Sequence, residues 1–186
     1  MASNATIFKA TLQISDMDRQ YYEDHTVTLA RHPSETDERM MVRLLAFVLH
    51  AHEALSFGRG LSTEEEPALW QKDLTGAIQQ WIEVGQPEEK TIRRACGRAK
   101  EVYIYIYGGR GADQWWEKHM ATLNRLENLV VMNLSLDESQ ALASLAQPGM
   151  QLQCTIQEGQ IWMASGENSV HIALTVLKSA SGRLGQ

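Results

Sequence analysis

The chain has little cysteine, no excess of positive charge and no long apolar run. Cys96 and Cys154 are the only cysteines in 186 residues. They lie far apart without a second ligand pair beside either, so the sequence indicates neither a disulfide framework nor a zinc site, and both are expected to be buried thiols. No stretch reaches the roughly 20 apolar residues that a membrane-spanning helix needs. Because the polar start MASNATIFKATLQ shows no leader, we expect a cytoplasmic protein with no membrane partner.

The formal net charge of −6 means that the chain as a whole does not attract nucleic acid or anionic lipid. Binding of phosphate would therefore need a local basic patch or a metal ion. A length of 186 residues and a hydrophobic content of 44% suit one globular domain over residues 1–186 with a sizeable core. The chain shows no internal repeat, no low-complexity tract and no linker.

The hydrophobic pattern predicts a single α+β domain of mixed α/β type. The first expected elements are a β-hairpin near residues 5–31 and a helix entered at Pro33 and Ser34, with Asp37 completing a loose cap. Short strands near 68–73 and 77–84, a helix beginning at Pro87 and a buried strand in EVYIYIYGG follow. The chain then continues with a helix over about 112–126, the strand NLVVMNL, the capped helix SLDESQALASLAQPG and a closing meander of three strands. We expect the last of these strands to be SVHIALTVLK.

Two acids are expected to face each other across the pair of short strands. If the turn is Asp73–Gly76, antiparallel pairing puts Glu66 opposite Glu83. Opposed carboxylates repel, unless they are solvated, one is protonated or a cation lies between them. Such a pair suits Mg²⁺ or Mn²⁺. The alternative is an ordinary frayed strand end at Pro67, where the two acids are simply solvated.

The preceding helix carries two further acids in its opening turn. Glu38 lies on the apolar stripe with Met41 and Leu45, so its carboxylate needs a partner: a buried arginine, backbone amides or the same metal site. Glu35 can pair with Arg39 at i,i+4. Both acids would also interact favourably with the helix dipole, so they can stabilise the helix without any other role.

The helix after Pro87 presents a row of positive charge. Lys90, Arg94 and Arg98 recur every four residues, and such a row could hold a phosphate chain. The alternative is the charged face of any surface helix. Between the strand and this helix, a bulge at Gly85 could swing Gln86 round to the face of Glu83.

These segments carry a resemblance to a known family. HPSETDERMMVRLLAF, GLSTEEEPALW and WIEVGQPEEKTIRRACGRAK strongly resemble the bacterial YaeQ family, over essentially the whole chain. That family is similar to a divergent branch of the PD-(D/E)xK nuclease-like superfamily. The resemblance implies a restriction-endonuclease-like core of helix, three-stranded sheet, helix and strand, with additional β-strands at the N- and C-termini.

The resemblance also implies roles for the acids. Glu38 would be the acid of the first core helix, Glu66 or Glu65 would take the aspartate position, and Glu83 would open the (D/E)xK element. In that scheme these acids bind Mg²⁺ or Mn²⁺, and a lysine orients or activates the attacking water.

The sequence departs from the superfamily pattern in two places. Ala68 follows Pro67 where a literal PD motif has aspartate, and Gly85 stands where the lysine belongs. Gln86 could position a water but carries no charge. The lysine could instead come from the next helix, either from Lys90, which lies one turn from Gln86 and is preferred, or from Lys100 in the last turn.

Two functions from different classes follow. The first is a Mg²⁺-dependent phosphodiester hydrolase acting on DNA or RNA, in which Glu38, Glu66 and Glu83 hold metal, Gln86 or Lys90 handles water, and Arg94 and Arg98 bind phosphate. The second is a non-catalytic protein of the same fold that binds nucleic acid or a protein partner in a regulatory role. The clustered acids favour the first function, whereas the missing lysine and the acidic balance favour the second.

Overall fold

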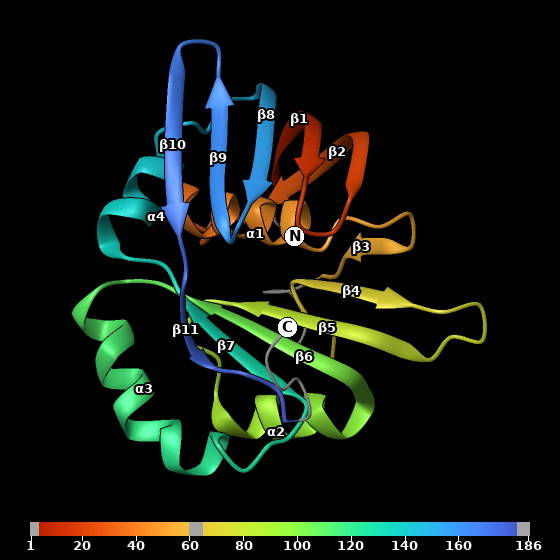
Figure 1. Cartoon of the computed structure of the whole chain (residues 1–186), viewed down its shortest axis with the longest axis vertical. Coiled ribbons are helices and arrows are strands. Elements are labelled where there is room, and N and C mark those ends of the chain that lie inside the picture. The colour runs from red at the N-terminus through yellow and green to blue at the C-terminus, as the bar shows by residue number, and fades with distance from the viewer. Residues whose placement is uncertain (1–3, 60–64, 182–186) are drawn as a thin grey trace. The chain divides into compact units, whose positions relative to one another are not determined.

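The computed structural model describes residues 4–59 and 65–181. The chain divides into two compact units, and each has its own mixed β-sheet (Figure 1). The first unit contains Met1–Leu49 and Leu136–Leu174, and the second contains His50–Ser135 and Thr175–Gln186. The predicted mixture of helices and strands is confirmed. The prediction that residues 1–186 form a single domain depends on whether the two units pack together as one body. It stays a prediction.

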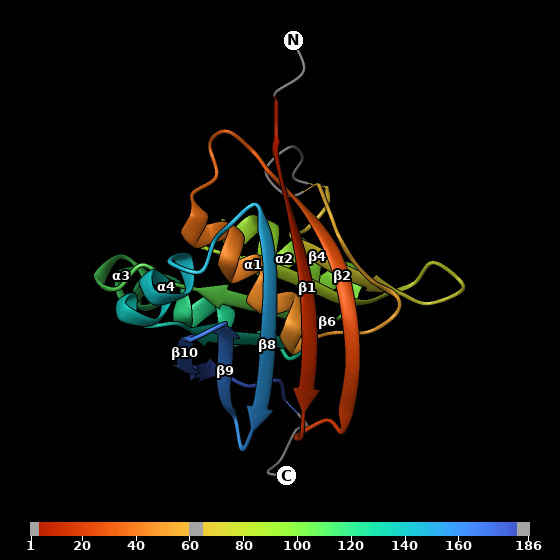
Figure 2. The same cartoon turned by 90° about the horizontal axis from the view of Figure 1, so that it is seen from above.

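The first unit is a five-stranded sheet with two helices. Its strands run in the order β10-β9-β8-β1-β2, and its elements are β1 (Thr6–Asp16), β2 (Tyr21–Arg31), α1 (Asp37–Leu49), α4 (Leu136–Ala143), β8 (Gly149–Gln157), β9 (Gln160–Ser165) and β10 (Asn168–Ala173). The predicted hairpin is β1 with β2, and β8, β9 and β10 form the predicted meander. A parallel pairing of β1 with β8 joins them (Figure 2). Alternate β1 side chains such as Leu12 and Ile14 are buried, as expected for a sheet with one covered face.

The first helix begins later than the sequence predicted. Thr36 Oγ1 accepts the amide of Arg39 at 3.1 Å, which is the hydrogen bond of an N-cap residue. Ser34, the predicted cap, instead places its hydroxyl 2.7 Å from His32 Nδ1. The prediction of a Ser34 cap was therefore wrong, because a second hydroxyl residue two positions on has the better geometry.

A buried ion pair anchors this helix. Glu35 and Arg43 are each 6% exposed, and Arg43 binds the carboxylate through both Nε (2.8 Å) and Nη2 (2.6 Å). Arg39 adds the predicted i,i+4 ion pair to the same carboxylate. Arg43 Nη2 also donates to the carbonyl of Ala30, at 3.3 Å, so the cluster joins the helix to the end of β2. Glu38, half-buried in the same turn, forms no hydrogen bond or ion pair with the described residues.

The second unit is a six-stranded sheet with two helices. Its strands run in the order β11-β7-β6-β5-β4-β3, and its elements are β3 (Leu55–Phe57), β4 (Leu69–Lys72), β5 (Ile78–Val84), α2 (Glu89–Arg98), β6 (Ala99–Ile106), α3 (Arg110–Leu123), β7 (Leu129–Asn133) and β11 (Thr175–Lys178). Strands β3, β4 and β5 pair antiparallel, whereas β5, β6 and β7 are parallel and joined through α2 and α3. The short strand β3 was not predicted.

Two predicted boundaries are corrected in this unit. Helix α2 follows an extended residue, Glu88, so it begins two residues after Pro87, and Lys100 lies in β6 rather than in the last helical turn. The expected single strand SVHIALTVLK is divided at Leu174, with β10 in one sheet and β11 in the other. In β11 the buried Lys178 donates its ammonium to the carbonyl of Leu129 at 2.9 Å, and burial lowers its pKa.

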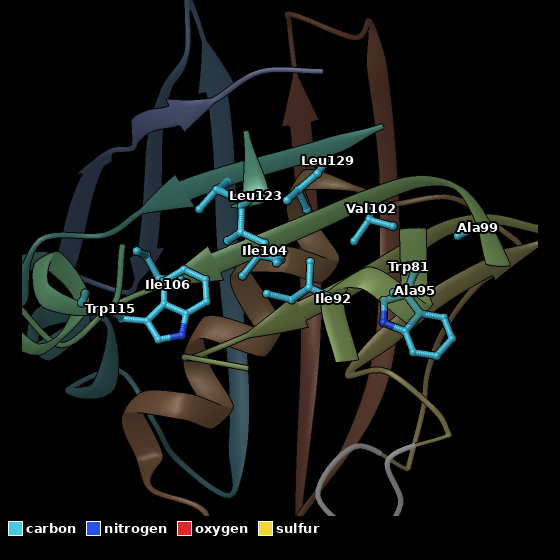
Figure 3. Close-up of a cluster of buried hydrophobic side chains, with 12 residues drawn as sticks. Trp81, Ile92, Ala95, Ala99, Val102, Ile104, Ile106, Trp115, Leu123 and Leu129 are labelled. Atoms are coloured by element: carbon cyan, nitrogen blue, oxygen red, sulfur yellow. The ribbon is translucent and has the colours of Figure 1, made fainter. Parts of the chain in front are cut away.

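One apolar cluster fixes α2 and α3 against the six-stranded sheet. Ile92 and Ala95 from α2 and Trp115 from α3 pack on Val102 and Ile104 of β6 (Figure 3). This spacing on α2 is the helical period of a buried stripe. The opposite side of α2, which carries the predicted row of positive charge, is therefore exposed.

Burial also decides the state of the two thiols. Burial raises the pKa of Cys154 to about 12 and that of the half-buried Cys96 to about 11. Both therefore remain protonated thiols at neutral pH. Cys154 is buried, as expected, whereas Cys96 is only half-buried. Over residues 4–59 and 65–181, no helix is long and apolar enough to cross a membrane.

The two acids at the start of α1, Glu35 just before the helix and Glu38 in its first turn, give a first test of what anchors the helix. We expect Glu35→Ala to lower the free energy of unfolding by about 3–5 kcal/mol, because it leaves a buried arginine without its partner. Glu38→Ala, the matched control, removes only a favourable dipole interaction of about 0.3–1 kcal/mol. Denaturant unfolding followed by circular dichroism measures both. Equal losses for the two variants would show that the Glu35 ion pair is not what anchors the helix.

Candidate functional site

The register of β4 against β5 differs from the prediction by two residues. Trp70 pairs with Trp81 and Leu69 with Ile82, whereas the predicted pairing of Glu66 with Glu83 would put Gln79 opposite Trp70. Strand β4 begins at Leu69, so Glu83 lies beyond the last paired residue. The predicted direct opposition of Glu66 and Glu83 is therefore wrong, and the like-charge argument for a cation between them loses its basis.

The turn between these strands explains the shift. Asp73 Oδ1 accepts the amides of Thr75 (2.8 Å) and Ala77 (3.0 Å), and the Asp73 amide donates to the Ala77 carbonyl at 2.9 Å. The turn is thus one residue longer than expected, and a bulge between Gln71 and Lys72 adds the second residue. A hydrogen bond from the Thr75 hydroxyl is the main cause that lowers the pKa of Asp73. An aspartate that organises a turn in this way is an Asx turn.

Glu83 is bound to the tryptophan two residues before it. The two side chains share one face of β5, and Glu83 Oε1 accepts the indole N–H of Trp81 at 3.0 Å. Trp81 is only 1% exposed, so the hydrogen bond satisfies a donor that would otherwise be buried without a partner. The carboxylate of Glu83 itself is half-buried.

Glu66 lies just before β4, on a segment that packs closely against the end of β3. Its Oε2 accepts the amide of Arg59 at 2.9 Å, and the Arg59 side chain lies 3.9 Å away. The Gly58 amide donates to the carbonyl of Ala68 at 3.0 Å. A Cβ at Gly58 would lie 2.1 Å from the carbonyl oxygen of Pro67, so only glycine permits this approach.

A pocket opens between α2 and the start of β4. It has a volume of about 390 Å³, and its lining residues are Glu65, Glu66, Trp70, Arg94 and Arg98. Arg98 Nη1 donates to the carbonyl of Glu65 at 3.4 Å. The structure therefore brings together four of the residues that the sequence singled out: the two alternative acids, Glu65 and Glu66, and both arginines. Their roles as metal and phosphate ligands stay predictions.

Two tryptophans form the aromatic side of this region. Trp70, which lines the pocket, meets Trp81 edge to face at 5.9 Å between ring centroids. The guanidinium of Arg98 lies 5.3 Å from the centre of the Trp81 ring, and the Lys72 ammonium lies 3.7 Å from that of Trp70. These are cation–π distances. Sequence reasoning missed both tryptophans as site residues, although the WIE segment puts Trp81 on the same strand face as Glu83.

Two predicted catalytic residues lie elsewhere in the second unit. Lys90 is exposed on α2 and is not among the residues that line the pocket. Gln86 donates through Nε2 to the carbonyl of Tyr107 at 3.4 Å, and this nitrogen lies against Gly108 and Gly111 at the start of α3. The side chain of Gln86 is thus directed at the loop before α3.

The expected metal ligands are distributed over both units. Glu38 belongs to the first unit, and Glu66 and Glu83 to the second, where each carboxylate accepts an N–H donor. Among the residues described, no three histidine, cysteine, aspartate or glutamate side chains form a group that could hold a metal ion. The metal site therefore stays a prediction.

The fold and pocket together define a mixed α+β protein that has, in its described residues, two sheets, four helices and a pocket lined by arginine, tryptophan and glutamate. The chain belongs to the YaeQ protein family, whose sequence model matches residues 1–174. Membership of this family is what the resemblance predicted, and it is confirmed.

Relatives and solved structures agree along almost the full length. The chain is 43% identical over 181 residues to "Uncharacterized protein YaeQ" of Salmonella typhi and 41% identical to that of Escherichia coli K12, with 97% of this chain and 100% of each relative covered. The crystal structure of YaeQ protein from Xanthomonas axonopodis pv. citri is similar with a TM-score of 0.91 at 48% identity, covering 94% of this chain and 99% of that one. The crystal structure of YaeQ protein from Pseudomonas syringae is similar with a TM-score of 0.92 at 35% identity, covering 97% of this chain and 100% of that one.

A pair of glycine substitutions tests how the pocket is held. We expect Gly58→Ala to destabilise the protein by more than about 1 kcal/mol, because its methyl group would collide with the Pro67 carbonyl. Gly97→Ala is the matched control: nothing lies within 4 Å of its Cβ position on α2, so it should stabilise the helix by up to about 1 kcal/mol. Thermal unfolding gives both values. A Gly58→Ala protein as stable as wild type would contradict the close packing of β3 on this segment.

Proposed function

We propose that the pocket between α2 and β4 binds the phosphate backbone of nucleic acid. The observation that carries this proposal is that Arg94 and Arg98, one helical turn apart, line the same pocket as Trp70. Guanidinium groups bind phosphate through paired N–H donors. An aromatic ring beside them adds a surface for a base or sugar, which a site for free phosphate alone does not need.

The negative net charge of the protein restricts the proposed binding of nucleic acid to the pocket. A formal net charge of −6 gives no general attraction to a polyanion, so affinity has to come from the two pocket arginines. Glu65 and Glu66 balance their charge within the pocket. We therefore expect moderate affinity that falls steeply with salt, with about one counterion released for each phosphate contact.

The order of elements along the chain supports placing the protein in the PD-(D/E)xK superfamily. Along the chain, α1 is followed by the three antiparallel strands β3–β5, then by α2 and by β6. This is the helix, three-stranded sheet, helix and strand that the resemblance implies. Binding is favoured over cleavage because Gly85 occupies the lysine position and Gln86 is engaged with Tyr107.

Charge-removal variants on α2 test the proposal. We expect Arg94→Ala and Arg98→Ala each to weaken binding of a fluorescein-labelled oligonucleotide several-fold and to reduce the salt slope by about one. Arg93→Ala is the matched control, since Arg93 is exposed on the same helix and does not line the pocket. Fluorescence anisotropy at several salt concentrations measures all three. If Arg93→Ala weakens binding as much as the pocket variants do, the site is not this pocket.

Mg²⁺-dependent phosphodiester hydrolysis is the second candidate. It is favoured by Glu83, whose carboxylate is hydrogen-bonded to the Trp81 indole, while the guanidinium of Arg98 lies beside the same ring. In this function Glu66 and Glu83 would hold Mg²⁺ or Mn²⁺, and Gln86 or Lys90 would position water. The metal would polarise the phosphoryl oxygen. A protein partner for the same pocket also stays a prediction.

Glu83→Gln separates cleavage from binding. Glutamine keeps an oxygen that can accept the Trp81 N–H, so the fold should be retained while the negative charge is lost. We expect this variant to lose any Mg²⁺-dependent cleavage of single-stranded DNA or RNA and to keep oligonucleotide affinity within about two-fold. Glu117→Gln, on the exposed side of α3, is the charge-matched control. Wild-type protein that cuts neither substrate with Mg²⁺ or Mn²⁺ would eliminate this candidate and leave the binding proposal standing.

A further inference from the structure

We infer that the pocket accepts an unpaired nucleotide, with its base stacked on Trp70 and its phosphate on Arg94 and Arg98. This inference rests on the proposed function and names the kind of nucleic acid that the site selects: single-stranded rather than duplex. It depends on three properties of the pocket, namely a rigid aromatic ring, a small volume and a balance of opposite charges.

The ring of Trp70 is held in a fixed position. Its cross-strand partner Trp81 meets it edge to face, and Trp81 is in turn 1% exposed and bound to Glu83 through its indole N–H. Trp70 itself is half-buried and lines the pocket. A ring that is already fixed loses little conformational entropy when a base stacks on it.

The Trp70 ring also interacts with a positive charge from its own strand. The Lys72 ammonium lies 3.7 Å from the ring centre, so one face of the indole is covered by a cation. A base would stack on the part of the ring that borders the pocket. Lys72 does not itself line the pocket, so the contacts to phosphate come from Arg94 and Arg98.

The volume of the pocket argues against a duplex. At about 390 Å³ it lies near the lower end of the roughly 300–1,000 Å³ range of small-molecule pockets. In a duplex the bases are stacked on one another, so their faces cannot reach an aromatic side chain. An unpaired nucleotide can present both its base and its phosphate to the same pocket.

The charge pattern leads to the same conclusion. A duplex groove binder needs an extended positive surface, whereas here two arginines are balanced by Glu65 and Glu66 within a chain of net charge −6. Stacking supplies affinity that does not depend on net charge and tolerates any base. A site of this composition therefore discriminates by the exposure of bases rather than by the number of phosphates.

Three labelled probes of equal length test the inference: a single-stranded oligonucleotide, its duplex and an abasic single strand. By anisotropy, we expect wild-type protein to bind the single strand at least about 10-fold more tightly than the other two, the size of effect expected when one stacked base is lost. Trp70→Leu should weaken single-strand binding about 10-fold and leave abasic binding unchanged. Trp70→Phe keeps an aromatic ring and should restore most of the affinity. Trp162→Leu, in the first unit and 37% exposed, is the control.

The outcomes separate this inference from the function on which it rests. If wild-type protein binds duplex and single strand equally, or if Trp70→Leu weakens single-strand and abasic binding alike, stacking on Trp70 is overturned. The effects of Arg94→Ala and Arg98→Ala on the same probes then still decide the phosphate proposal. If those arginine variants bind every probe as wild type does, the proposed function itself fails. Circular dichroism melts of the Trp70 variants show whether a loss reflects unfolding, in which case Trp70→Phe supplies the comparison.

Discussion

The pairing of Trp70 with Trp81 is the interaction on which the second unit depends. It sets β4 against β5 in one register and gives Trp81 a cross-strand aromatic contact. Trp81 then joins the core cluster with α2, binds the carboxylate of Glu83 and lies beside the guanidinium of Arg98. A slip of one residue would move every side chain of β4 to the opposite face. The pocket, the position of Glu83 and the packing of α2 therefore all depend on the register of β4 against β5. The long turn at Asp73 and the adjacent bulge produce this register.

The acids of this chain show why residue type alone does not identify a site. Glu35 and Glu38 lie three residues apart and both precede apolar positions of α1. Glu35 is enclosed by Arg39 and Arg43 and has a structural role, whereas Glu38 pairs with none of the residues described. Because burying a charge is costly unless it is paired, the buried acid is the one with partners. The half-buried position of Glu38 is compatible with a ligand role but does not by itself provide one.

Periodicity predicted most elements of the fold, because strands and helices leave alternations of period 2 and 3.6 in the sequence. It failed where local chemistry or tertiary contacts decide. Strand β3 is only three residues long, too short for a period, and Ser34 and Thr36 are both competent caps. Residues 169–178 contain no glycine or proline that would mark a break, so the division of this run between two sheets was not predicted. On α2, the spacing of Arg94 and Arg98 correctly placed both on one face, and the pocket confirms that they lie together. The position of Glu66 relative to Glu83 was missed, since it depends on turn length and a bulge.

The glycine at position 85, where the resemblance to the PD-(D/E)xK superfamily would place a lysine, has a structural explanation. Gly85 has a φ of +91° and donates its amide to the carbonyl of Tyr105 at 2.9 Å, so the chain turns there from β5 towards α2. Side chains other than glycine rarely adopt this conformation. A lysine at position 85 would therefore strain the turn, and Gln86, the next residue, is already directed at the loop before α3. The turn that connects β5 to α2 thus disfavours a lysine at position 85 and leaves Glu83 and both arginines in place. Under the proposed function, a site with these arginines and without that lysine would bind a phosphodiester more readily than it cleaves one.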